Sequence, residues 1–278
     1  MDFANKTCLI TGGASGMGFL AGQCFSENGA NIVLADIDEA ALENKVGQIR
    51  QNGGKCIGAV CDVRNYAQVL RTRDAAVKAF GSVDILLNCA GGASTRVLNC
   101  PQKEFKDIPI EIFDWGIDVN FKGTFYFSHA VMQQMAKQKS GVILNFGSIT
   151  GEEGCETNID YSACKSGIMY GMTKSLALYG AKYNVRVCCI SPGPVLTRPG
   201  MAAMKTLLGR AAQPQEIINL ALYLASEKAA FITGENILID GGSTNKSSLG
   251  QYQLIPYLKS RGISRLDGIY VSHTDEDH

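Results

Sequence analysis

The chain has 278 residues, 46% of them hydrophobic, so it is long enough to bury the core of one large α/β domain. Lysine plus arginine equals aspartate plus glutamate, at 26 each, which argues against nucleic-acid or anionic-membrane partners. No apolar run approaches membrane-spanning length, and the first residues show no charged-then-apolar leader. We therefore expect a cytoplasmic protein. Its ten cysteines contain no Cys-x-x-Cys pair and are expected to be buried, reduced small hydrophobes, with reactive or metal-binding thiols as the alternative.

Short β-rich runs alternate with segments of helical periodicity. The predicted strands are Thr7–Ile10, Asn31–Asp36, Lys55–Asp62, Val83–Asn88, Gly141–Gly147, Val185–Ser191 and Glu235–Asp240. The predicted helices cover 16–28, 38–52, 65–80, 112–137, 160–181 and 214–226. Continuous apolar strands separated by helices are typical of a parallel sheet covered on both faces. The sequence thus predicts an α/β, doubly wound Rossmann-type domain over residues 1–242, with a mostly parallel seven-stranded sheet.

A glycine-rich turn follows the first predicted strand and opens a helix. In this turn Gly12 allows a tight bend, Gly16 lets the backbone approach a phosphate, and Gly18 lets the helix pack closely on the strand. A pyrophosphate would then lie at the helix N-terminus, where free N–H groups favour an anion. Asp36 ends the second strand, where a carboxylate can accept the ribose hydroxyls of NAD and repel the extra phosphate of NADP. NAD is therefore favoured, and the alternative is that Asp36 is only a strand-end turn residue.

Tyr161 and Lys165 are four residues apart in the helix predicted over 160–181, so they share one face. A cation about 4–6 Å from a phenol stabilises the phenolate. Ser148 follows the apolar run of the fifth strand and could hold a substrate oxygen beside that phenol. Such a set would exchange a proton with an alcohol or ketone. The alternative is an ordinary helix-face tyrosine beside a solvated lysine.

Further motifs, taken in order, make residues 1–242 resemble the short-chain dehydrogenase/reductase family. Asp62-Val63 resembles the family's adenine-contacting pair, and Asn88-Cys89-Ala90-Gly91 resembles its Asn-Asn-Ala-Gly turn with a cysteine in second place. Asn120 matches the helix asparagine that holds a proton-relay water. The segment Pro192–Thr197 matches the one that orients the nicotinamide.

The resemblance implies a role for each matched residue. Tyr161 would exchange the proton with the substrate, and Lys165 would lower the pKa of Tyr161 and bind the nicotinamide ribose. Ser148 would position the substrate oxygen, and Asn120 would complete the proton relay to solvent. The implied cofactor contacts are Gly12, Ser15, Gly16, Met17, Gly18, Asp36, Ile37, Asp62, Val63, Asn88, Ala90, Gly91, Tyr161, Lys165, Pro192, Gly193, Val195 and Thr197.

The function that follows is hydride transfer between NAD(H) and a secondary alcohol or ketone, in a homotetramer as the resemblance implies. The candidate substrates are sugar alcohols or keto-sugars, hydroxysteroids, and 3-hydroxyacyl thioesters. Two alternatives remain open: an inactive nucleotide-binding or regulatory protein with this fold, and a metal-dependent hydrolase acting through the C-terminal segment.

Two segments depart from the family pattern. Thr197–Arg210, which normally forms the lid, is short, so the pocket is expected to be more open or completed by a neighbouring subunit. Ser94–Ile110 is long and carries Arg96, Lys103 and Lys106. These cations are either solvated or face an acidic group on the substrate, and the sequence leaves both interpretations open.

Residues 243–278 form an appendage that is not expected to be an independent domain, because it is too short to build a core. From about Ile239 it resembles the start of the metallo-β-lactamase-like domain of DNA-uptake channel proteins. Leu254–Gly262 fits that pattern, and His273–His278 matches a His-x-Asp-x-Asp-His metal motif. The chain stops before the downstream ligands, so we expect no functional metal centre.

Overall fold

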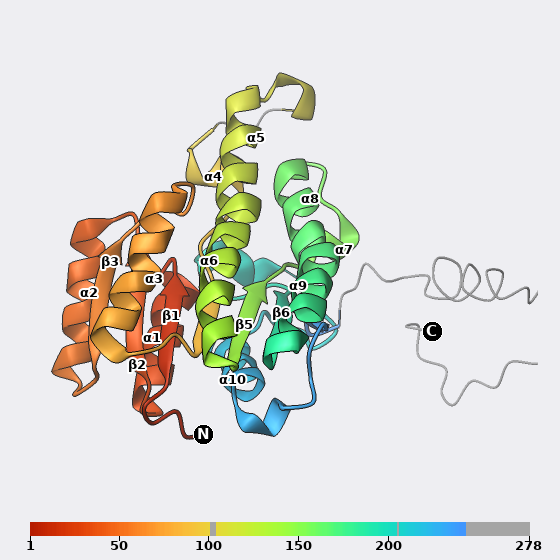
Figure 1. Cartoon of the computed structure of the whole chain (residues 1–278). Coiled ribbons are helices and arrows are strands. Elements are labelled where there is room, and N and C mark those ends of the chain that lie inside the picture. Colours follow the sequence, from red (N-terminus) through yellow and green to blue (C-terminus); the bar gives the residue numbers. More distant parts are fainter. Residues whose placement is uncertain (101–103, 205, 243–278) are drawn as a thin grey trace, which may run out of the picture.

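The computed structural model describes residues 1–100, 104–204 and 206–242. Seven parallel strands form one sheet in the order β3-β2-β1-β4-β5-β6-β7, with helices on both faces (Figure 1). The strands are β1 Thr7–Thr11, β2 Asn31–Asp36, β3 Cys56–Val60, β4 Ile85–Asn88, β5 Gly141–Phe146, β6 Val185–Pro192 and β7 Asn236–Ile239. The predicted doubly wound fold is confirmed. The predictions made for the tail fall on residues that lie outside the described ranges.

Ten α-helical segments are found in the described ranges. They are α1 Gly16–Glu27, α2 Glu39–Gln51, α3 Tyr66–Phe80, α4 Ser94–Val97, α5 Ile110–Ile117, α6 Gly123–Gln138, α7 Thr150–Glu153, α8 Ile159–Gly167, α9 Thr173–Gly180 and α10 Pro214–Ala225. Short 3₁₀ turns lie at Phe105–Asp107, Ala181–Tyr183, Pro199–Ala203 and Glu227–Ala229. All six predicted helices are present, but the short α4 and α7 were not predicted.

Two of the predicted helices contain a π turn that their periodicity does not reveal. The π turn η2, Asp118–Lys122, joins α5 to α6, and η3, Ile168–Met172, joins α8 to α9. The two long helices pack side by side (Figure 1). A π turn inserts one extra residue into the helical ladder, and such turns occur frequently at functional sites.

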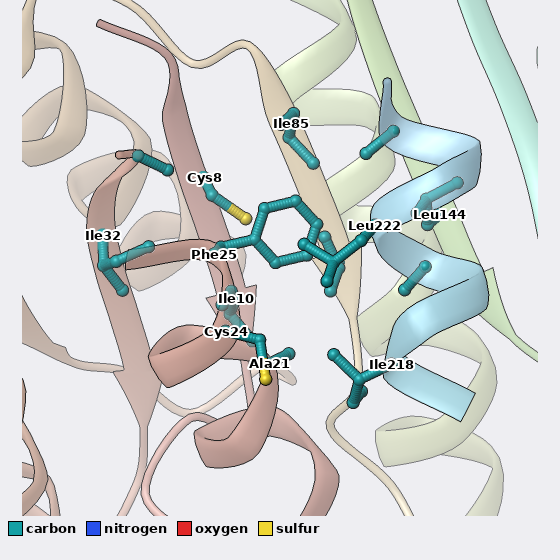
Figure 2. Close-up of a cluster of buried hydrophobic side chains, with 14 of the residues drawn as sticks. Cys8, Ile10, Ala21, Cys24, Phe25, Ile32, Ile85, Leu144, Ile218 and Leu222 are labelled. Atoms are coloured by element: carbon teal, nitrogen blue, oxygen red, sulfur yellow. The ribbon is translucent and has the colours of Figure 1, made fainter. Parts of the chain in front are cut away.

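The first face of the sheet is covered by α1, α2 and α10. Its core contains Phe25 from α1, which lies among Cys8 of β1, Ile85 of β4 and Leu222 of α10 (Figure 2). Phe25 is fully buried, and burying such a side chain contributes roughly 1.5–3 kcal/mol. These contacts fix α1, whose N-terminus begins directly after the glycine-rich turn.

The second face is covered by α3, α6 and α9, with Phe127, Val131 and Met135 of α6 fully buried there. Capping residues mark the two ends of α3 on this face. The Asn65 side chain accepts from the N–H of Gln68 to cap α3, and Gly81 ends that helix in the left-handed conformation. None of the helices in the ranges that the structure describes has both the length and the apolar character needed to cross a bilayer.

The sheet order places the functional motifs together. From β1 the chain adds β2 and then β3 on one side of β1, and β4 is then placed on the other side of β1. The strand order therefore changes direction between β1 and β4, and the carboxyl ends of these two strands flank that point. Ligands of open α/β sheets bind at this point. The glycine-rich turn follows β1, the turn at Ala90 follows β4, and Ser148 follows β5.

All ten cysteines are free thiols, and seven of them are buried. Burial raises the pKa of Cys56 to about 12 and that of Cys164 to about 11. The predicted burial is confirmed for these seven. Across the described ranges, no cluster of three or more His, Cys, Asp or Glu side chains could hold a metal ion.

Candidate active site and cofactor cleft

The glycine-rich turn has the shape that a pyrophosphate requires. Gly12 has a φ of +65°, and a Cβ added to Gly18 would lie 2.2 Å from the Gly12 carbonyl oxygen. Gly16 has a φ of +50°, and a Cβ there would meet no atom of the described chain within 4 Å. In this same region Ser15 makes no side-chain cap to α1, and the first turn has no acidic residue. The helix N-terminus therefore keeps free N–H groups facing open space, which fits a bound dinucleotide.

A cavity of about 290 Å³ lies beside this turn. It is lined by Gly12, Ser15, Asp36, Ile37, Cys61, Asp62, Val63, Arg64, Ala90, Gly91, Val97, Trp115 and Val119. Asp36 accepts the N–H of Ala14 at 2.9 Å through Oδ2 and the N–H of Asp38 at 3.1 Å through Oδ1. The carboxylate is thus held against the turn while it lines the cavity. The structure brings together eight predicted cofactor-binding residues in this cofactor-side cavity.

Arg64 is a cation of this cavity that sequence reasoning missed. Its Nη2 lies 2.8 Å from Asp62 Oδ2, and its Nε and backbone N–H also donate to the Asp62 carboxylate. The Arg64 guanidinium lowers the pKa of Asp62 below its usual value. The carboxylate that the resemblance assigns to adenine therefore already has a partner. The signal available in the sequence was the Asp-x-Arg spacing in a turn, which places the two side chains within reach.

The turn after β4 is fixed by buried polar contacts. Asn88 donates through Nδ2 to Ser128 Oγ at 3.0 Å and to Asn145 Oδ1 at 2.9 Å, and it lines neither the cofactor-side cavity nor the catalytic cavity described below. Its side chain ties β4 to β5 and α6, so its predicted role as a cofactor contact stays a prediction. Ala90 donates its N–H to Thr11 Oγ1 at 3.0 Å, which holds the β4 turn against the end of β1.

Asn120 lies in the π turn and is fully buried. Its Oδ1 accepts the Gly92 N–H at 2.9 Å, and its Nδ2 donates to the carbonyls of Gly92 at 3.0 Å and Gly116 at 2.8 Å. A Cβ on Gly91 would lie 2.4 Å from Asn120 Oδ1 and 3.8 Å from Lys165 Nζ. The side chain predicted to hold a relay water is thus bonded to the protein backbone and fixes the Gly91–Gly92 turn beside Lys165.

Tyr161 and Lys165 lie side by side on α8, as their spacing predicts. Lys165 Nζ is 5.4 Å from the centre of the Tyr161 ring and donates to the Phe146 carbonyl at 2.7 Å. Lys165 is only 6% exposed, so this bond anchors the cation at the end of β5 rather than leaving it in solvent. The interpretation of Lys165 as a solvated lysine is therefore wrong.

Ser148 and Tyr161 line a second cavity of about 340 Å³, called the catalytic cavity below after the role predicted for these two residues. Its other lining residues include the predicted Met17, Pro192, Gly193, Val195 and Thr197. Ser148 Oγ accepts from Thr150 Oγ1 at 3.1 Å. Because that oxygen already accepts a bond, the Ser148 hydroxyl proton can be donated to a substrate oxygen.

A larger outer cavity of about 860 Å³ adjoins the catalytic cavity. The two share the lining residues Ala93, Arg96, Asn158 and Arg198. The sequence did not predict that the catalytic cavity is also lined by Arg198, Met201 and Met204. The feature that could have indicated this is that they follow the predicted nicotinamide segment, which ends at Thr197. Lys106 pairs with Glu104 at 2.8 Å on the exposed surface, whereas Lys103 lies outside the described residues.

Comparison with known proteins agrees with this geometry. Residues 12–244 match a family model described as enoyl-(acyl carrier protein) reductase. D-threitol dehydrogenase of Mycolicibacterium smegmatis is 35% identical over 87% of this chain and 94% of its own length. This chain belongs to the short-chain dehydrogenase/reductase family. Its relatives include NAD-dependent glycerol dehydrogenase of Listeria innocua, 33% identical over 88% of this chain and 96% of that protein.

A solved structure of NAD⁺-bound xylitol dehydrogenase has a TM-score of 0.78 and 30% identity, and covers 87% of this chain and 100% of that one. This short-chain dehydrogenase/reductase is therefore an oxidoreductase that uses a nicotinamide nucleotide and acts on alcohols. The likeness of the tail to a metallo-β-lactamase-like domain has no such support, since the family match ends at residue 244.

Proposed function

We propose that this enzyme interconverts a secondary alcohol and a ketone using NAD(H), with Ser148, Tyr161 and Lys165 as its catalytic residues. One observation carries the proposal. Ser148 and Tyr161 open into the same cavity, while Lys165 is buried beside the Tyr161 ring and anchored to the Phe146 carbonyl. A buried cation next to a cavity-facing phenol is the arrangement that proton exchange with a substrate oxygen requires.

When bound, the nicotinamide nucleotide supplies the hydride donor or acceptor. Tyr161 gives its hydroxyl proton to the carbonyl oxygen in reduction and takes it back in oxidation. The Lys165 ammonium stabilises the phenolate that forms, since little solvent screens it at 6% exposure. Ser148 donates its proton in a hydrogen bond to the same substrate oxygen, because its own oxygen already accepts from both the N–H and the hydroxyl of Thr150. Asn120 holds the Gly91–Gly92 turn beside Lys165.

Replacing Tyr161 by phenylalanine tests this mechanism. Tyr161→Phe removes only the transferable proton, so we expect turnover to fall at least a hundredfold while NADH binding stays within twofold. Tyr223→Phe is the matched control, because Tyr223 is partly exposed on α10 and lines neither the catalytic cavity nor the outer cavity. Steady-state rates and NADH fluorescence titration provide the two measurements. If Tyr161→Phe kept a tenth or more of the wild-type rate, the mechanism would be wrong.

The cofactor is proposed to be NAD rather than NADP. Asp36 places a carboxylate in the cofactor-side cavity, and the charge of Arg64 in that cavity is offset by Asp62. We expect kcat/KM to favour NAD at least tenfold, about 1.4 kcal/mol. Asp36→Ala should reduce that ratio, whereas Asp74→Ala, at an exposed position on α3, should not. Equal preference in the wild type would refute the assignment.

For the substrate, we propose first a sugar alcohol or keto-sugar, with hydroxysteroids and 3-hydroxyacyl thioesters as the other classes. The names of the threitol, glycerol and xylitol dehydrogenases support polyols. A screen of NADH oxidation over carbonyl compounds, paired with NAD reduction over the matching alcohols, ranks the three classes. Absence of any polyol or keto-sugar activity would remove the first class.

The enzyme is also proposed to be a homotetramer. The long helices α5–α6 and α8–α9 expose large apolar side chains, including Ile117 at 42%, Phe125 at 47% and Leu178 at 78%. Adjacent exposed apolar faces of this kind mark association surfaces. Light scattering after size exclusion should give four times the chain mass, and Leu178→Glu should lower it. A monomeric wild type would overturn the proposal.

A further inference from the structure

We propose that Arg96 and Arg198 form an anion-recognition pair, so that the substrate carries a carboxylate or phosphate some distance from its reacting carbon. This inference rests on the proposed dehydrogenase function and names the class of its substrate. Arg96 belongs to α4 and Arg198 to the segment after β6, and both line the catalytic cavity and the outer cavity. Both residues therefore border the space that links the catalytic cavity, which Tyr161 lines, to the outer cavity.

Neither arginine is engaged elsewhere in the described part of the chain. Arg64, Arg73 and Arg210 each pair with an acidic side chain, whereas Arg96 and Arg198 make no side-chain hydrogen bond or ion pair with any residue in the described ranges. A guanidinium presents five donors and matches the geometry of carboxylate and phosphate oxygens. Two such groups beside one cavity are consequently available to an anionic ligand.

Arg96 is mounted on a braced segment. Ser94 Oγ donates to Asp160 Oδ2 at 2.7 Å, and Thr95 Oγ1 donates to Asn158 Oδ1 at 2.9 Å. Both acceptors lie at the start of α8, the helix that also carries Tyr161. A Cβ on Gly92 would lie 2.8 Å from Arg96 Nη2, so the guanidinium also rests near the backbone that Asn120 fixes. The backbone that carries Arg96 is thus fixed relative to α8 and Tyr161 before a substrate arrives, which lowers the cost of binding.

The second arginine has a similar support. The β6 segment that leads to Arg198 is held by a bridge between Val195 and Ala212, with the Leu196 N–H donating to the Ala212 carbonyl at 2.9 Å. Arg198 therefore follows a fixed stretch of backbone that lines the catalytic cavity.

The acidic groups of the outer cavity do not cancel this charge near the catalytic residues. Glu104 is paired with Lys106, and Glu156 lines the outer cavity but not the catalytic one. Phe105 and Ile108 line the outer cavity as well, which provides an apolar wall for the body of the substrate. The matching ligand is an oxo acid or a phosphorylated keto-sugar whose anionic group extends toward the outer cavity.

Matched pairs of ketones test the proposal. The pairs are acetoacetate, levulinate and dehydrocholate, each with its methyl ester, and dihydroxyacetone phosphate with dihydroxyacetone. We expect at least one anion to exceed its neutral counterpart tenfold or more in kcat/KM at low salt. Arg96→Gln and Arg198→Gln should each raise KM for that anion about tenfold with kcat within twofold, so that most of the preference for the anion over its neutral partner is lost. Arg71→Gln, an exposed arginine on α3 outside all three cavities, is the matched control.

A binding measurement separates this proposal from the proposed function. The Tyr161→Phe enzyme with NADH should bind the preferred anion more tightly than its neutral counterpart, with an affinity that falls as salt rises. Comparison of the three carboxylate pairs with the phosphate pair shows which anionic group the site prefers. Equal binding of both members of every pair, or equal loss of both in the arginine variants, overturns the anion pair even where turnover continues. Selective anion binding with no turnover of any ketone in the wild type would instead overturn the dehydrogenase function alone.

Discussion

Asn120→Ala is predicted to destabilise the ligand-free enzyme, because this side chain supports the backbone beside the active site. The wild-type amide makes three buried hydrogen bonds, two to Gly92 and one to Gly116. Alanine would leave the buried N–H and carbonyl of Gly92 without these partners. Each unsatisfied buried group costs about 1–3 kcal/mol, so we expect a total loss of roughly 3–4 kcal/mol. That is a large share of the roughly 5–15 kcal/mol that stabilises a typical protein.

The loss should appear as a fall in melting temperature of roughly 6–16 °C, since 1 kcal/mol corresponds to about 2–4 °C in a domain of this size. Urea unfolding followed by circular dichroism provides an independent measure. Asn219→Ala is the control, because Asn219 is exposed on α10 and its side chain accepts a hydrogen bond from the exposed Gln215. If the two variants unfolded at the same urea concentration, the assigned structural role of Asn120 would be refuted. Asn120→Asp should also destabilise, because a carboxylate cannot donate to two carbonyls.

Three further predictions follow from local geometry. Gly18→Ala should abolish NADH binding in a fluorescence titration, since the added Cβ would lie 2.2 Å from the Gly12 carbonyl oxygen. The control Gly47→Ala, whose Cβ would meet nothing within 4 Å inside α2, should retain binding and raise the free energy of unfolding by about 0.5–1 kcal/mol. Equal NADH binding by the two variants would contradict this prediction. The Arg210 side chain and the Gln213 N–H lower the pKa of Glu216 to about 2, so the carboxylate stabilises the start of α10 above about pH 4.5 and this contribution is lost as pH falls toward 2. The melting difference between wild type and Glu216→Gln should accordingly shrink from neutral pH to about pH 3, and a growing difference would reverse the sign of the argument. A chain ending at Gly242 should keep its fold, oligomeric state and kinetic constants, because β7, the last strand of the sheet, already ends at Ile239. Loss of the oligomer or of activity would show that residues 243–278 contribute to the enzyme.

The fold and the placement of Tyr161 beside Lys165 were predictable because their signals are local. Strand and helix periodicity placed all seven strands and all six predicted helices within two residues of their observed bounds. The four-residue spacing of Tyr161 and Lys165 placed both on one side of α8, and the strand-turn-helix context identified the glycine-rich turn. Each of these features depends on neighbours within one or two turns of chain, so the sequence carries it without knowledge of packing.

Contacts between distant segments were decided only by the tertiary structure. The partners of Asn120 lie on the turn after β4, and the anchor of Lys165 is the carbonyl at the end of β5. The π turns within α5–α6 and α8–α9, one of which carries Asn120, have no period of their own in the sequence. Arg96 and Arg198 are separated by most of the second half of the sheet, yet they border the same cavities. Such convergence arises from how strands and helices pack, and a one-dimensional pattern of apolar and polar residues does not encode which side chains then meet.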